Sequence, residues 1–174
     1  MIYPWQSQQW QQLQSQRREQ RLPHALLLTG QTGLGKRDFA AMLAKSLLCK
    51  QPQSSGEACG ACDACLLLQV AQVHDESNNR DSALIHMGMH PDCLWLEPEE
   101  ADKAIKVDDI RTLCAALSLT SQFGGYKVAV INMADSMNIN AANSLLKTLE
   151  EPGANTVLIL VSSRPQRLPI TIRS

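Results

Sequence analysis

The fold is decided by one stretch of the chain, which reads HALLLTGQTGLGKRDFA (residues 24–40). Within it, His24–Thr29 is a short and mainly apolar run of the kind that forms a buried strand. Three glycines follow within Gly30–Gly35, and Lys36–Leu48 then carries apolar residues at helical spacing. We therefore expect a strand, a glycine-rich turn and a helix, in that order.

Strand and helix patterns alternate along the rest of the chain. The expected strands are Cys93–Leu96, Lys127–Asn132 and Thr156–Ser162, and the expected helices are Pro4–Gln20, Val107–Leu117 and Ile139–Leu149. Such alternation is typical of an α/β fold in which helices cover both faces of a mainly parallel sheet. The polar segment Val73–Gly88 interrupts the alternation, and we expect it to be a surface loop or a partly disordered insertion.

Length and composition indicate one globular domain. The chain has 174 residues, of which 44% are hydrophobic, enough for a sizeable core. Its net charge of −1 argues against a domain that wraps nucleic acid over its whole surface. The longest aliphatic run, Val157–Val161, is far shorter than the roughly 18 residues of a membrane span. With no apolar segment after Met1 that resembles a secretory signal, we expect a cytoplasmic protein.

The glycine-rich turn nearly matches the phosphate-binding pattern G-x-x-x-x-G-K-[ST]. Gly30, Gly33 and Gly35 would let backbone N–H groups curl around phosphate oxygens at the start of the following helix. Lys36 would reach the outer phosphates. The context of strand, turn and helix favours a phosphate-binding loop (P-loop) over a chance glycine-rich turn.

Three positions depart from an active nucleotide site. The residue after the P-loop lysine should offer a hydroxyl to Mg²⁺, but it is Arg37, which repels a cation. The strand Lys127–Asn132 should end in acids that hold the metal and orient water, but Asn132 and Met133 stand there. We therefore predict a degenerate site with no catalytic residues, and we regard ATP or ADP binding as doubtful. Two alternatives remain for Arg37: it helps to bind an anion, or it pairs with a carboxylate such as Asp38 or Asp135 and blocks the site.

Four cysteines predict a metal site. Cys49, Cys59, Cys62 and Cys65 include two overlapping C-x-x-C units, which match structural zinc with four thiolate ligands. Four thiolates leave no open coordination position, so the role would be structural. A redox C-x-x-C motif is the alternative, but it would leave two of the four cysteines without a role.

These features together resemble the clamp-loader ATPases of the AAA+ superfamily. The resemblance is carried by YPW (residues 3–5), HALL (24–27), the P-loop, the four cysteines, HPD (90–92), VDDIR (107–111), GGYKV (124–128), AANSLLKTLEEP (141–152) and RS (173–174). It covers nearly the whole chain. It implies an AAA+ type P-loop domain over residues 1–174 with a zinc-binding module inserted at 49–65.

Within that family, the loss of the metal-binding residues resembles the non-hydrolysing, stator-like subunits of the bacterial DNA polymerase III loader. The resemblance implies a component of a DNA-directed DNA polymerase holoenzyme. Its implied partners are the other loader subunits, of the motor and delta types, with the sliding clamp and primed DNA reached through the complex. The resemblance also implies a truncated chain, because Ser174 would be the Ser of the family's Ser-Arg-Cys motif and the lid and collar domains would follow it.

Two alternatives remain open at this stage. One is an ATP-hydrolysing motor subunit of the same loader, which would need a Mg²⁺ ligand from outside the usual positions. The other is a zinc-based nucleic-acid module with a vestigial P-loop. That module would need a basic, aromatic-bearing knuckle, yet residues 49–65 contain one basic residue, Lys50, and no aromatic residue.

Overall fold

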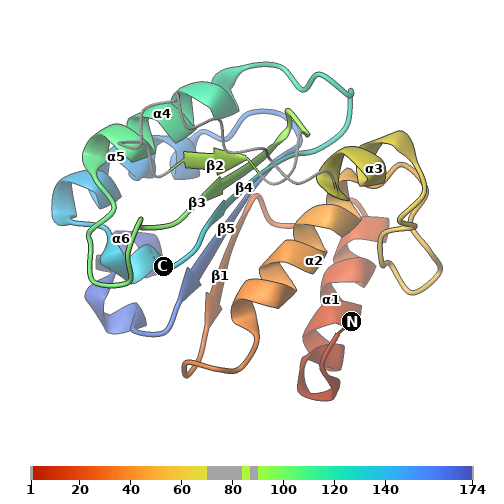
Figure 1. Cartoon of the computed structure of the whole chain (residues 1–174), viewed down its shortest axis with the longest axis horizontal. Coiled ribbons are helices and arrows are strands. Elements are labelled where there is room, and N and C mark those ends of the chain that lie inside the picture. The colour runs from red at the N-terminus through yellow and green to blue at the C-terminus, as the bar shows by residue number, and fades with distance from the viewer. Residues whose placement is uncertain (1, 70–83, 87–89, 174) are drawn as a thin grey trace.

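The computed structural model describes residues 2–69, 84–86 and 90–173. Its centre is a five-stranded sheet with the order β1-β5-β4-β3-β2 (Figure 1). The strands are β1 (Ala25–Thr29), β2 (Leu84–His86), β3 (Cys93–Leu96), β4 (Lys127–Ile131) and β5 (Thr156–Ser162). The first four in this order, β1, β5, β4 and β3, pair in parallel.

The edge strand β2 corrects one expectation. We expected a loop over residues 73–88, but Leu84–His86 forms β2 and pairs antiparallel with β3 at the edge of the sheet. A three-residue edge strand is too short to give a periodic signal in the sequence. An antiparallel edge on an otherwise parallel sheet is common in this fold class. Residues 73–83 and 87–88 lie outside the described residues.

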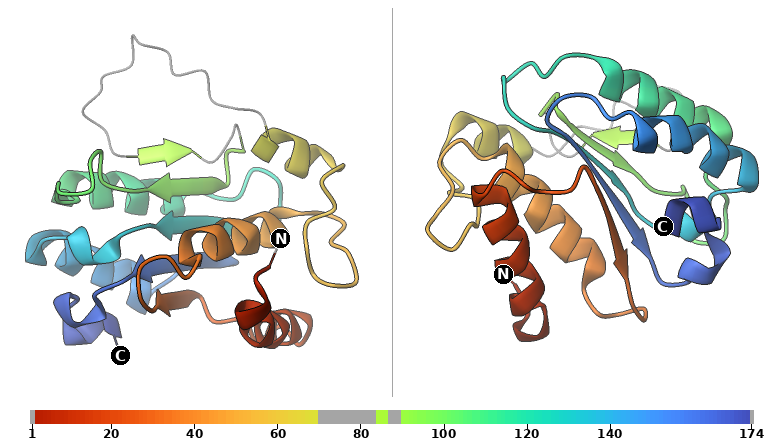
Figure 2. Two further views of the ribbon diagram at one scale, coloured as in Figure 1. Left: turned by 60° about the horizontal axis from the view of Figure 1, so that its bottom comes forward. Right: turned by 180° about the vertical axis from the view of Figure 1, so that it is seen from behind.

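Helices cover both faces of the sheet, as expected (Figure 2). On one face lie α1 (Ser7–Arg18), α2 (Lys36–Leu48) and α3 (Asp63–Gln69). On the other lie α4 (Val107–Ser118), α5 (Ile139–Glu150) and the short α6 (Ile170–Arg173). Three 3₁₀ turns complete the described elements: η1 (Pro4–Gln6), η2 (Ala134–Ser136) and η3 (Pro165–Arg167).

The central strands separate two hydrophobic cores. In β4, Val128 and Val130 face the core under α1 and α2, whereas Ala129 and Ile131 face the core under α4 and α5. Side chains alternate between the faces of a strand, so a strand covered on both faces is apolar throughout. Every residue of β4 and of β5 is buried. This burial explains the continuous apolar runs at residues 128–131 and 157–161, to which the strand ends add the buried polar residues Lys127, Thr156 and Ser162.

The parallel topology brings several chain segments to one edge of the sheet. The P-loop follows β1, Glu97 follows β3 and Asn132 follows β4, so all three lie at the carboxyl ends of parallel strands. Ligand sites in open α/β sheets form at this edge.

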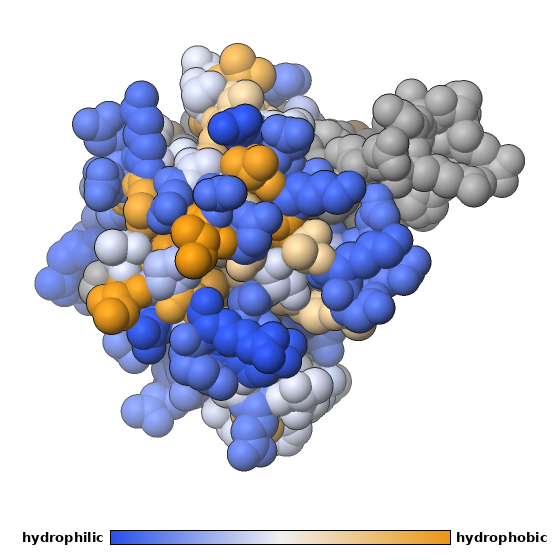
Figure 3. All heavy atoms as spheres, turned by 90° about the vertical axis from the view of Figure 1, so that its left-hand side faces the viewer, coloured by the Kyte–Doolittle hydropathy of each residue, from blue (hydrophilic) through white to orange (hydrophobic). Residues whose placement is uncertain are grey.

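Figure 3 shows the face at the left of Figure 1, where apolar side chains are interspersed among hydrophilic ones. Among the described residues, no helix is both long and apolar enough to cross a membrane.

Candidate functional site

The glycine-rich turn between β1 and α2 has the backbone conformation that its glycines permit. Gly30, Gly33 and Gly35 have φ angles of 144°, 88° and 74°, which residues with a side chain rarely adopt. Gly35 is also the N-cap of α2, so the turn leads directly into the helix N-terminus. The turn therefore has the form of a cradle at the N-terminus of α2.

Lys36 folds back over this cradle. Its ammonium donates to the carbonyl oxygens of Gly30, at 2.8 Å, and Gln31, at 2.6 Å. Burial lowers the pKa of Lys36 from its ordinary value, and the negative charge of Asp135 opposes that shift. The lysine thus closes the loop on itself in a conformation that an incoming anion would have to replace.

The N-terminal segment holds the outer side of the loop, which our sequence reasoning did not anticipate. The side chains of Trp5 and Gln6 both donate to the Leu34 carbonyl, at 3.2 and 2.9 Å. The rings of Tyr3 and Trp5 are stacked with centroids 4.8 Å apart. The sequence signal was the YPW stretch, but nothing in its spacing shows that it lies against a turn about 30 residues further along the chain.

Arg37 pairs with a carboxylate that we did not predict. Its Nε lies 3.3 Å from Oε2 of Glu97 and its Nη2 lies 3.4 Å from Oε1. The expected alternatives, Asp38 and Asp135, are therefore wrong as partners. Asn132 also donates to Glu97, with Nδ2 3.1 Å from Oε2. Two of the three degenerate positions thus meet at one acid just beyond the end of β3.

Asp135 is engaged elsewhere. Its carboxylate accepts a hydrogen bond from Ser162 Oγ at 2.7 Å and lies 3.4 Å from Nε of Arg164. Its side chain is 5% exposed. Met133, which precedes η2, has a φ angle of 54° and offers no charge or ligand oxygen. Asp135 is thus already paired and does not replace the acids missing after β4.

These groups line a pocket of about 700 Å³ that is open to solvent. Its walls include Gly33, Gly35, Lys36, Arg37, Asn132, Met133, Asp135 and Arg164. Gly30 is not among the lining residues, although it contributes to the turn beneath them. The cations Lys36, Arg37 and Arg164 and the N-terminus of α2 suit an anion, and the lining also includes the carboxylates of Asp38 and Asp135. The side chains at the two usual metal-ligand positions do not fit Mg²⁺, because a guanidinium and an amide replace a hydroxyl and a carboxylate.

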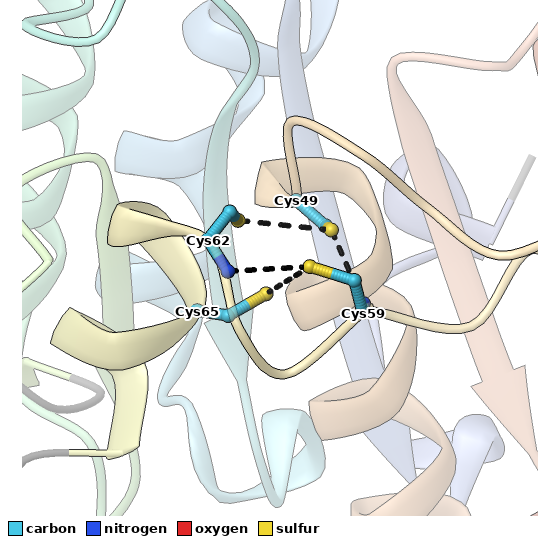
Figure 4. Close-up of side chains that lie close together, drawn as sticks. All are labelled: Cys49, Cys59, Cys62 and Cys65. Carbon is cyan, nitrogen blue, oxygen red and sulfur yellow. Dashed lines mark hydrogen bonds between the residues drawn. The ribbon is translucent and has the colours of Figure 1, made fainter.

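The four cysteines of the expected zinc module lie together beyond the end of α2 (Figure 4). All four Sγ atoms are within 4.8 Å of one another. The Cys49–Cys62 and Cys59–Cys65 sulfur pairs are each 3.9 Å apart. Zn–S bonds of about 2.3 Å at tetrahedral angles place sulfurs roughly 3.8 Å apart, so the cluster fits a metal of this kind.

Backbone amides also point at these sulfurs. The amides of Ala61 and Cys62 donate to Cys59 Sγ at 3.4 and 3.3 Å, and the Cys59 amide donates to Cys49 Sγ at 3.3 Å. Gly60, with a φ angle of 73°, permits the tight turn between them. Donors aimed at sulfur favour the thiolate form, the form that binds metal.

The thiols of the cluster differ in their pKa values. Burial tends to raise the pKa of Cys62, but hydrogen bonds from neighbouring amides and thiols outweigh burial and lower the value to about 6. Burial raises the pKa of Cys65 to about 12. A bound cation would stabilise all four thiolates together, because a coordinating thiol is deprotonated outright.

One contact within the module and one between the module and α1 do not involve the sulfurs. Lys50 pairs with Asp63 at 2.7 Å, which joins the segment after Cys49 to the start of α3. Trp10 of α1 donates through its indole N–H to the Ser55 carbonyl at 2.9 Å. The Trp10 hydrogen bond therefore holds the module against α1 without involving its sulfurs.

A P-loop α/β domain with a four-thiol cluster after the helix that follows the P-loop is the class that this fold and these sites define. Residues 5–174 match the family described as DNA polymerase III, delta subunit, and the chain belongs to that family.

The chain is similar to DNA polymerase III subunit delta′ of Pseudomonas aeruginosa, with 46% identity over 173 residues. These cover 99% of the chain and 46% of that protein. It is also 32% identical over 154 residues to DNA polymerase III subunit tau of Salmonella typhimurium, covering 88% of the chain and 21% of that protein. The chain thus spans about half the length of the delta′ relative.

A solved structure shares the fold. It is a DNA polymerase III gamma subunit-related protein of Thermotoga maritima, with a TM-score of 0.58 and 21% identity, and the match covers 93% of this chain and 43% of that one. The two curated relatives are both named as subunits of DNA polymerase III.

Proposed function

We propose that this chain is the P-loop domain of a non-hydrolysing, stator-like subunit of the DNA polymerase III clamp loader. In the intact protein, it would pack against a motor subunit and help to place the sliding clamp on primed DNA. The lid and collar domains would follow the residues present here. The proposal also assigns a structural zinc ion to Cys49, Cys59, Cys62 and Cys65.

One observation carries the non-hydrolysing role: Glu97 accepts hydrogen bonds from both Arg37 and Asn132. Hydrolysis of ATP in P-loop proteins needs Mg²⁺, held by a hydroxyl after the lysine and an acid after the strand. Here the residue at the first position is a cation and the residue at the second is an amide donor. Both point at an acid that lies outside the usual pattern. Such an arrangement supports a site without a catalytic metal.

A motor subunit that hydrolyses ATP is the second candidate. It is favoured by the intact glycine turn and Lys36, by the pocket of about 700 Å³ beside them, and by the similarity to a protein named subunit tau. It would require a Mg²⁺ ligand from another position, and Asp135 is already paired with Ser162 and Arg164. We therefore place this function second.

Reconstitution of the loader from full-length subunits tests the proposal. Loaders that contain the Lys36→Ala variant should keep the wild-type ATPase rate, whereas the matching lysine substitution in a motor subunit should lower it. Omission of this subunit should abolish clamp loading. A Lys36→Ala loader that loses the ATPase activity of one site would favour the motor role, and loading that persists without the subunit would overturn both.

A further inference from the structure

Three donors converge on the side chain of Glu97. The indole N–H of Trp95 lies 3.1 Å from Oε2, in addition to the contacts from Arg37 and Asn132. The side chain of Glu97 is 24% exposed, so these donors replace much of its hydration. Burial tends to raise the pKa of Glu97, but the three donors and the charge of Arg37 outweigh burial and lower it. Glu97 is therefore a carboxylate at neutral pH.

The guanidinium of Arg37 is fixed on two sides. Both Nε and Nη2 face the carboxylate of Glu97, and the ring of Trp95 lies 5.0 Å from the guanidinium carbon. Arg37 occupies the position after the P-loop lysine and Asn132 the position after β4, which are the two positions from which a P-loop protein holds its metal. A cation of the chain itself thus lies next to a carboxylate that accepts hydrogen bonds from both positions.

We propose that Glu97, which is not itself among the lining residues, is a positioning residue for this pocket: it holds Arg37 in the lining as a built-in cation in place of a divalent metal, so that the pocket accepts phosphate groups only in metal-free form. The proposal deepens the proposed function, because it concerns the same pocket and names the ionic form of ligand that the pocket takes. With Glu97 neutralised by Arg37, Lys36 and the backbone amides remain to meet a phosphate.

A simple surface ion pair is the competing explanation, since the side chain of Arg37 is 59% exposed and exposed pairs contribute little to stability. Two features argue for a selective role. Asn132 turns its amide to Glu97 although its position is normally an acid. Removal of Arg37 would also leave the partly buried Glu97 without its cation, and a divalent metal could compensate that charge. An ordinary surface pair would not create a metal requirement when one partner is removed.

The experiment measures binding of ADP by calorimetry, with Mg²⁺ and with EDTA in its place. Arg37→Thr restores the hydroxyl and frees Glu97, so its ADP affinity should rise about tenfold or more when Mg²⁺ is added. The double variant Arg37→Thr with Glu97→Gln should lose that dependence, because the carboxylate is gone. Glu99→Gln in the Arg37→Thr background is the matched control, since Glu99 pairs with Lys103 and not with Arg37, and it should keep the dependence.

The outcomes separate the explanations. Mg²⁺-dependent binding in Arg37→Thr that disappears with Glu97→Gln supports the proposal. Binding in Arg37→Thr that is absent or indifferent to Mg²⁺, or a dependence that survives Glu97→Gln, overturns it. Arg37→Ser replaces Arg37→Thr if the latter does not fold. The test does not involve the assembled loader. The proposal about Glu97 can therefore be overturned while the subunit still supports clamp loading without hydrolysis.

Discussion

The ring of Tyr3 lies directly against the α-carbon of Gly35. A Cβ atom built on Gly35 would lie 2.5 Å from Cε2 of this ring, closer than real atoms approach. Gln6, in the same N-terminal segment, donates to the Gly35 carbonyl at 3.2 Å. The N-terminal segment therefore packs against the P-loop where Gly35, which has no side chain, leaves room for the Tyr3 ring.

Substitution of Gly35 by Ala should destabilise the domain. The new methyl group would displace the Tyr3 ring, and alanine would have to adopt a φ angle near 74°. A non-glycine residue in this region costs about 1–3 kcal/mol, so the free energy of unfolding in urea should fall by at least that amount. Gly125→Ala is the control, since no atom lies within 4 Å of its added Cβ. Equal stability of the two variants would contradict the expectation.

Loss of the proposed zinc should melt the cysteine module and leave the sheet folded. Protein purified without chelator should contain about one equivalent of zinc, and Cys59→Ser should reduce that content. Cys114→Ser is the matched control, because Cys114 lies outside the cluster and should keep the metal. Zinc content below about half an equivalent in the wild type would count against the assignment.

Hydrogen exchange separates local from global effects of chelation. The amides of Ala61 and Cys62, which donate to sulfur, should lose protection when zinc is removed. The amides of β4 should keep it, because that strand lies between two cores that do not include the module's loop. Simultaneous loss of protection in both places would show that the fold of the whole domain depends on the metal.

The isolated domain should show no Mg²⁺-dependent ATPase activity. Arg37 and Asn132 face Glu97 in place of a metal, and Met133 cannot orient water. The loss of metal and base together removes several kcal/mol of transition-state stabilisation, which corresponds to orders of magnitude in rate. Phosphate release in the presence of DNA and clamp measures this. A turnover near 1 per second that disappears in Lys36→Ala would overturn the degenerate-site interpretation.

The sequence predicted those parts of the molecule in which local pattern and environment agree. The interiors of β4 and β5 (residues 128–131 and 157–161) are apolar because helices cover both faces of the sheet, and the apolar stripe of α5 ends shortly before Pro152. Glu97 was missed because it lies 60 residues from Arg37 and meets it only where two parallel strands end together. β2 was missed because three residues at a sheet edge carry no periodic signal.

Asp92 should give the domain a measurable dependence on pH. Its side chain is fully buried and accepts hydrogen bonds from Ser121 Oγ at 2.8 Å and from the amides of Gln122 and Phe123, each at 3.0 Å. Burial tends to raise the pKa of Asp92, but these donors outweigh burial and lower it from the ordinary value. Since the folded-state pKa lies below the unfolded-state value of about 3.9, the stabilisation is complete above that pH and is lost as the pH falls through the folded-state pKa.

Comparison of the wild type with Asp92→Asn isolates this contribution, because other carboxylates cancel in the difference. At neutral pH, the variant should be less stable by about 1–3 kcal/mol, since an amide nitrogen would face donors that need an acceptor. Below about pH 4 the difference should shrink, because protonated Asp92 then resembles the amide. Burial lowers the pKa of the neighbouring His90, so that residue stays neutral at neutral pH and contributes no charge to the comparison there. Urea unfolding from neutral to acidic pH measures the difference, and a constant value across that range would show that the Asp92 carboxylate does not stabilise the fold through its charge.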